Sequence, residues 1–173
     1  MVPLFVLSTV FALLVLLRRA FPKRARYAYS DAAAWSLAVM LLLTASAHFN
    51  AMRPDLVRMV PTWLPAPELL VSLTGVLELL GAAGLFFART RVWSGVLIAL
   101  MFVSLLPANI YAAQQGLTIA GQPVTALWLR IPMQLLFIAF ALAPALSRYR
   151  TLRAGLPFAK RAQSGASNNT MPS

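Results

Sequence analysis

The sequence has no cysteine, one histidine and only four acidic residues among its 173 positions. Without cysteine, the chain can form no disulfide, iron–sulfur cluster, thiol redox pair or cysteine zinc site of its own. One histidine and four carboxylates also leave too few ligands for a transition-metal centre, unless another subunit supplies some of them. We therefore expect no metal site in this chain.

Charge is also scarce, because charged residues make up 11% of the chain and hydrophobic residues 60%, with a mean hydropathy of +0.76. This composition lies outside the range of soluble proteins and predicts an integral membrane protein with room for one domain. The net charge of +11 comes from basic residues clustered between apolar runs. Such clusters serve membrane topology and lipid headgroups, so nucleic acid is not an expected partner.

Five apolar stretches are long enough, or nearly so, to cross a bilayer as helices. They cover residues 2–17, 32–49, 68–87, 92–111 and 126–147. The first stretch carries its positive charges, Arg18 and Arg19, after the apolar run and lacks a small-residue cleavage site. This is the reverse of a secretory signal peptide, so we expect a retained helix. The predicted fold is an all-α membrane helical bundle with five spans.

Lysine and arginine are distributed unevenly between the connections. Residues 18–31 hold five, residues 88–91 hold two and residues 148–173 hold five, whereas the other side holds only Arg53 and Arg58. By the positive-inside rule, the N-terminus lies outside and the C-terminus in the cytoplasm. The last segment, 148–173, ends in a polar, apolar-poor run and is predicted to be a disordered cytoplasmic tail.

The connection over residues 50–67 contains four prolines, which exclude a long helix. Between them, apolar residues share one helical face and charged residues lie off it: Met52, Leu56, Met59 and Val60 against Arg53, Asp55 and Arg58. This pattern, with Trp63 nearby, predicts a short amphipathic helix in the headgroup layer. It is interpreted either as a surface loop over the helix ends or as a lid over a site that opens outward.

Glu78 lies near the middle of the third apolar stretch. A carboxylate at that depth costs several kcal/mol unless it has a partner or is neutral, so it marks a functional-site hypothesis. Small residues share its side of the helix, namely Ser72, Gly75, Gly81 and Ala82. Neighbouring helices can therefore approach closely and enclose the acid.

Three other spans also carry strongly polar side chains, which are His48, Asn109, Arg130 and Gln134. At about 1.5 Å per residue, Glu78 and Gln134 lie at a similar depth, with Arg130 about one turn shallower. We predict that Glu78 accepts hydrogen bonds from Arg130, from Gln134 or from both. Alternatively, these polar residues only lock the helices together.

His48 allows two interpretations. Its imidazole can titrate near physiological pH and pass a proton to a quinone or another substrate. A single histidine at a helix end is also commonly an interfacial residue that hydrogen-bonds to backbone or water. No hydrolase or nucleotide-binding motif is present, and no catalytic residue is assigned from the sequence.

Several motifs follow one another along residues 32–144. They are AHF at 47–49, VPTWLPAP at 60–67, LTGVLELLGAAGLF at 73–86, PANIYAA at 107–113 and LWLRIPMQLLFIAFAL at 127–142. With these motifs the chain resembles the DoxX-like family of small bacterial membrane proteins. The resemblance implies a multi-pass protein of the bacterial plasma membrane with a four-helix domain at 32–147. Residues 1–31 would then add a helix and a basic loop, and residues 148–173 a basic tail.

The wider superfamily includes a subunit of a thiosulfate:quinone oxidoreductase, a maturation factor for methylamine dehydrogenase and chaperone-like members. Function therefore varies within the fold, and the first hypothesis is a redox-associated subunit that binds a quinone or another small amphipathic molecule in the outer half of the bundle. Its partners would be the lipid bilayer and a protein of a membrane redox complex. By matching position, the ligand-binding set is Glu78, Asn109, Arg130 and Gln134, with His48 beside it. A non-catalytic scaffold or assembly factor is the alternative, and a small-solute transporter is a weaker one.

Overall fold

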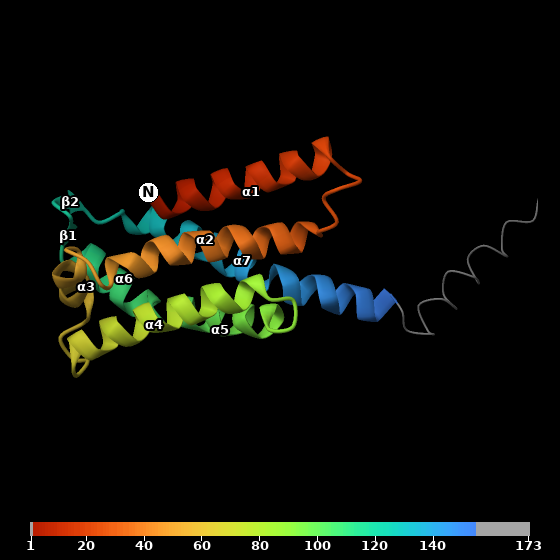
Figure 1. The fold of residues 1–173 in the computed structure, drawn as a ribbon. Coiled ribbons are helices and arrows are strands. Elements are labelled where there is room, and N and C mark those ends of the chain that lie inside the picture. The colour runs from red at the N-terminus through yellow and green to blue at the C-terminus, as the bar shows by residue number, and fades with distance from the viewer. Residues whose placement is uncertain (1, 155–173) are drawn as a thin grey trace, which may run out of the picture.

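The computed structural model describes residues 2–154, in which five long helical segments run side by side (Figure 1). The segments are α1 (Val2–Ala20), α2 (Tyr29–Ala47), α4 (Pro67–Phe86), α5 (Arg91–Ser104) continued by α6 (Leu106–Gln114), and α7 (Leu127–Ala154). Each is apolar and long enough to cross a membrane, with α5 and α6 together forming one span. The prediction of an all-α bundle with five candidate spans is confirmed. Helix α7 runs on to Ala154 rather than ending at Ser147, and residues 155–173 of the predicted tail lie outside the described residues.

Four helices form a closed ring in which α2 packs against α4, α4 against α5, α5 against α7 and α7 against α2. Helix α1 lies outside this ring, along α2 (Figure 1). Only Leu7 of α1 is fully buried, and the Phe11 ring lies 5.0 Å from that of Phe140 on α7. The structure thus consists of a four-helix core with one added N-terminal helix.

Small residues bring the ring helices into close contact. A Cβ atom built on Gly95 of α5 would lie 2.1 Å from the carbonyl oxygen of Ala141 on α7. One on Gly81 of α4 would lie 2.8 Å from the Ile98 side chain of α5. The close approach predicted for the Glu78 side of α4 is therefore confirmed.

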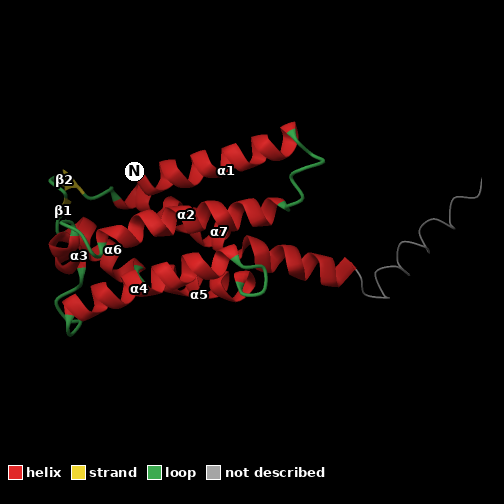
Figure 2. Cartoon of the chain, in the orientation of Figure 1, coloured by secondary structure: helices red, strands yellow, loops and turns green. Residues whose placement is uncertain are grey.

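Short elements close one end of the bundle, which we call the hairpin end (residues 48–66 and 115–126). They are the helix α3 (Arg53–Met59) and the strands β1 (Thr118–Ile119) and β2 (Gln122–Pro123), which pair antiparallel (Figure 2). The amphipathic helix predicted in this region is confirmed, with Met59 buried and Arg58 exposed. The turn between the strands has positive φ angles at both Ala120 and Gly121, as a tight two-residue hairpin turn requires.

The fourth span is broken at Leu105, between α5 and α6. Pro107 has no N–H group to donate to the carbonyl of Val103 and its ring crowds the preceding turn, so a straight helix cannot continue there. Pro107 therefore accounts for the break in the fourth span. After the break, α6 packs against α3 and α7 at the hairpin end.

The opposite end, which we call the basic end (residues 21–28, 87–90 and 148–154), is held together by Arg91. Its guanidinium donates to the carbonyl oxygens of Leu85 and Phe86 at 2.8 and 2.9 Å and to Asp31 at 2.6 Å. It also lies over the Trp35 ring, with 5.3 Å to the centroid. From the sequence, Arg91 is only a topology signal, but in the structure it is buried and ties α2, α4 and α5 together.

Replacing Gly95 with alanine should force α5 away from the Ala141 backbone, which cannot move independently of α7. We expect Gly95→Ala to lower the free energy of unfolding by about 2 kcal/mol, as overpacking does. Gly81→Ala is the matched control, because the Ile98 side chain can change rotamer and the loss should be smaller. Chemical unfolding in bicelles, followed by circular dichroism, measures both. An equal loss of unfolding free energy in the two variants would contradict the contact between Gly95 and the Ala141 backbone.

Asp55 fastens the hairpin to α3, because its Oδ2 accepts a hydrogen bond from the Ala120 N–H at 2.7 Å and its Oδ1 pairs with Arg58. The backbone bond from Ala120 and then Arg58 hold the pKa of Asp55 below its ordinary value of 3.8. A carboxyl with a lowered folded-state pKa stabilises above the unfolded pKa and loses this effect as the pH falls through the folded one. We expect the Ala120 amide resonance to titrate with a midpoint below 3.8 in NMR spectra. The same transition in Asp55→Asn would refute this assignment.

Candidate functional site

Glu78 is buried inside the ring, with 5% of its surface exposed. Its Oε2 lies 2.7 Å from Oγ1 of Thr44 on α2, and its Oε1 lies 3.7 Å from Nε2 of His48, which caps the same helix. Thr44 and His48 are one helical turn apart, so one face of α2 supplies both partners. The prediction that Glu78 faces into the bundle is confirmed.

The His48 ring is held from its other side. Its Nδ1 lies 2.7 Å from the carbonyl oxygen of Val71 and 3.4 Å from Oγ1 of Thr74. Gly75 makes room for it, because a Cβ at that position would lie 2.6 Å from the His48 Cβ. A carbonyl oxygen only accepts hydrogen bonds, so Nδ1 must carry a hydrogen and Nε2 is left to face Glu78.

The cluster of Thr44, His48 and Glu78 has two consistent proton arrangements. In one, a charged imidazolium faces a carboxylate and the Thr44 hydroxyl donates to Glu78. In the other, Glu78 and His48 are both neutral, the Glu78 proton lies on Oε1 and faces the Nε2 lone pair, and the Thr44 hydroxyl donates to Oε2 or to the Leu41 carbonyl oxygen at 3.1 Å. Both arrangements place a hydrogen between Glu78 and His48.

The predicted hydrogen bonds from Arg130 and Gln134 to Glu78 are wrong. Arg130 donates to Oδ1 of Asn109 at 2.8 Å, and Gln134 donates to the carbonyl oxygen of Phe102 at 2.7 Å. The reason is the order of helices in the ring, where α7 packs against α2 and α5 and lies diagonally across from α4. Of the five predicted ligand-binding residues, the structure brings Glu78 and His48 together and pairs Arg130 with Asn109 elsewhere.

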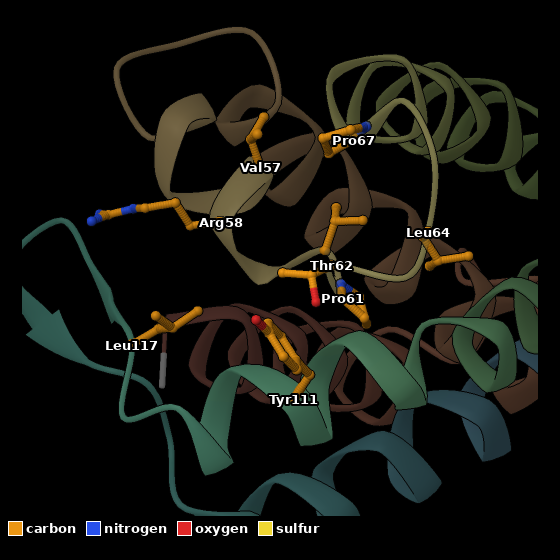
Figure 3. A pocket seen from close by; sticks show the side chains of 9 residues that line it. Val57, Arg58, Pro61, Thr62, Leu64, Pro67, Tyr111 and Leu117 are labelled. Carbon is orange, nitrogen blue, oxygen red and sulfur yellow. The ribbon is translucent and has the colours of Figure 1, made fainter.

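A cavity of about 470 Å³ opens at the hairpin end (Figure 3). It is lined by residues of α3, the loop after it, the start of α4, α6 and the β1 side of the hairpin: Val57, Arg58, Val60, Pro61, Thr62, Leu64, Pro67, Tyr111 and Leu117. Tyr111 extends from α6 toward the loop that carries Thr62 (Figure 3). The lining is apolar except for Arg58, Thr62 and Tyr111, and it contains none of the five predicted site residues.

One face of α4 connects the cavity with the buried acid. Pro67 lines the cavity, Val71 accepts the His48 hydrogen bond, Gly75 contacts the same ring and Glu78 carries the carboxyl group. These positions recur at helical spacing and share one side of the helix. The rise from Pro67 to Glu78 is about 16 Å at 1.5 Å per residue.

Sequence reasoning missed the two threonines and the cavity. Thr44 lies four residues before His48, and Thr74 lies four residues before Glu78, so a search for hydroxyls one turn from each ionisable residue would have found both. No comparable signal exists for the cavity, because its walls come from segments far apart in the chain.

Replacing Thr44 with valine keeps the shape of the side chain but removes the hydroxyl beside Glu78. We expect Thr44→Val to lower the free energy of unfolding by about 1 kcal/mol, as loss of a polar contact between membrane helices does. Thr74→Val removes the 3.4 Å contact with His48 and bonds to carbonyl oxygens of its own helix, but no contact with the buried carboxyl group, and should cost less. Unfolding of both variants in the same bicelles tests this order. A larger loss for Thr74→Val would contradict it.

A family model described as a domain of unknown function, DUF8561, matches residues 37–145. No curated protein and no solved structure matches the chain. The matched region begins within α2 and ends within α7, so it includes the hairpin end, the cavity and the Glu78 cluster, and leaves out α1. The chain therefore belongs to the DUF8561 family of domains of unknown function.

Proposed function

We propose that this protein is a redox-associated subunit of a bacterial plasma membrane that binds a quinone or another small amphipathic molecule at the hairpin end. The cavity is the observation that carries this proposal. Its volume of about 470 Å³ lies within the range of small-molecule sites, and such sites combine an apolar lining with a few polar groups. A quinone consists of a polar ring with an apolar tail, which matches the lining of this cavity.

The polar groups of the cavity narrow the choice of ligand. Thr62 and Tyr111 can donate hydrogen bonds, as can the N–H groups of Arg58 that its pair with Asp55 leaves unused, and no carboxylate is among the lining residues. A ligand whose polar atoms are acceptors suits this set best, and the carbonyl oxygens of a quinone are acceptors. The apolar residues around them suit its ring and the start of its tail.

The Glu78 cluster lies about 16 Å along α4 from Pro67 at the cavity, on the helix face that both share. Proton exchange with a ligand, as in the sequence-based interpretation of His48, would require hydrogen-bond contact between the ligand and this cluster. Direct contact between this cluster and the ligand is not required for binding in the cavity.

The proposed orientation places the hairpin end outside and the basic end in the cytoplasm. Among the described connections, the hairpin end carries only Arg53 and Arg58, whereas residues 18–28 and 88–91 carry most of the others. This asymmetry follows the positive-inside rule. The resemblance to DoxX-like proteins supports both the bacterial membrane and the link to redox complexes.

A bulky side chain at Leu117 should fill the cavity and exclude the ligand. We expect Leu117→Trp to weaken binding of a short-chain benzoquinone about tenfold or more, because about 60 Å² of apolar contact is worth about 1.5 kcal/mol. Titration of the purified protein in a neutral detergent measures the affinity. Leu100→Trp is the matched control, because Leu100 is 61% exposed on the outside of the bundle.

The hydroxyl of Tyr111 gives the second arm of this test. Tyr111→Phe should weaken binding of the quinone, because a quinone carbonyl oxygen loses the hydrogen bond from the Tyr111 hydroxyl. Binding of an analogue that has a tail of the same length but no carbonyl groups should be unaffected. Equal quinone affinity for the wild type, Leu117→Trp and Leu100→Trp would rule out the cavity as the binding site. A failure of the wild type to bind any quinone would favour the scaffold alternative.

A further inference from the structure

The arginines within the bundle differ in how far their guanidinium groups are satisfied. Arg91 donates three hydrogen bonds, one of them to the carboxylate of Asp31. Arg53 also donates three, to the carbonyl oxygens of His48 and Glu68 and to the Ser72 hydroxyl. The half-buried Arg130 donates a single hydrogen bond, and its acceptor is a neutral amide.

No carboxylate in residues 2–154 lies within 4.0 Å of the Arg130 guanidinium. Its bond to Asn109 uses one of five N–H donors, so the others remain available for a ligand. A cation at membrane depth without an anionic partner is unfavourable. The guanidinium therefore favours an anion supplied from outside the chain, and its fork geometry fits the oxygens of a phosphate group particularly well.

The position of Arg130 indicates where this anion comes from. Arg130 lies three residues after the start of α7 at Leu127, about 4.5 Å along the helix axis. Trp128, in the same turn, is 77% exposed, and tryptophan is enriched at the level of the lipid headgroups. Phospholipid phosphates lie at this level, within reach of a long arginine side chain.

This site is separate from the cavity. Asn109 and Tyr111 are two positions apart on α6 and so do not lie on the same side of the helix. Neither Asn109 nor Arg130 lines the cavity. A ligand at Arg130 can thus be tested without assuming that a quinone binds.

We propose that Arg130 and Asn109 form a binding site for the phosphate group of a membrane phospholipid. The Asn109 amide oxygen holds the guanidinium in place, and the free N–H groups of Arg130 bind the phosphate oxygens. Trp128 and Ile131 beside this site are exposed. The acyl chains of the bound lipid can therefore stay in the surrounding bilayer. The shared chemistry is a phosphate, so free inorganic phosphate is the competing source.

Binding to the full chain, delipidated in a neutral detergent, tests the proposal with three probes. They are dihexanoyl phosphatidylglycerol, dihexanoylglycerol without the phosphate, and inorganic phosphate. We expect the phospholipid alone to raise the melting temperature at low concentration. Arg130→Gln should weaken phospholipid binding about tenfold, because a hydrogen-bonded charge pair is lost. Arg89→Gln removes an exposed arginine at the basic end and should bind like the wild type.

Asn109→Asp keeps the test valid if Arg130→Gln fails to fold. The new carboxylate should pair with Arg130 and compete with the phosphate, so binding should weaken while the helix content in circular dichroism stays unchanged. Unaltered phospholipid binding in Asn109→Asp and Arg130→Gln would overturn the proposal. Equal protection by dihexanoylglycerol would show that the phosphate is not recognised. Displacement of the lipid by an equal concentration of inorganic phosphate would overturn the lipid as its source.

Discussion

A carboxyl group buried among apolar helices must have polar partners, and this requirement explains the arrangement around Glu78. Its partners, Thr44 and His48, both come from the last turns of α2. His48 can reach the acid because Gly75 leaves space for its ring. The tight packing of α2 against α4 and the hydrogen bonding of the acid are therefore two aspects of one interface. A larger residue at position 75 would disturb both.

The ring order of the helices decides which polar residues can meet. Depth along the membrane normal follows from position in the sequence, and on that basis Glu78 and Gln134 lie at the same level. Lateral position depends on which helices are neighbours, and α4 and α7 are not neighbours in the ring. The polar groups of α7 accordingly bond to the fourth span, at Phe102 and Asn109. Three polar groups form in separate parts of the bundle in place of one central network: Glu78 with Thr44 and His48, Arg130 with Asn109, and Gln134 with the Phe102 carbonyl oxygen.

Much of the fold could be predicted because its signals are local. Span lengths, the break near Pro107 and the short helix at 53–59 each follow from residues close together in the chain. The side on which Glu78 faces also follows from the small residues around it. The partners of Glu78 and the cavity depend on contacts between distant segments, for which a single sequence has no direct signal. The buried role of Arg91 was missed for the same reason, because its acceptor Asp31 lies on another helix.

The two ends of the bundle differ in the partners of Arg91 and Arg130. At the basic end, the buried Arg91 has a carboxylate, two carbonyl acceptors and an aromatic ring as partners. At the hairpin end, the break in the fourth span places α6 against α3, and a cavity with three hydrogen-bond donors opens between them. Near that end, Arg130 also has only a neutral partner. Unused donors are costly in a membrane unless something binds them, and this cost is the physical basis of the two binding sites proposed near the hairpin end.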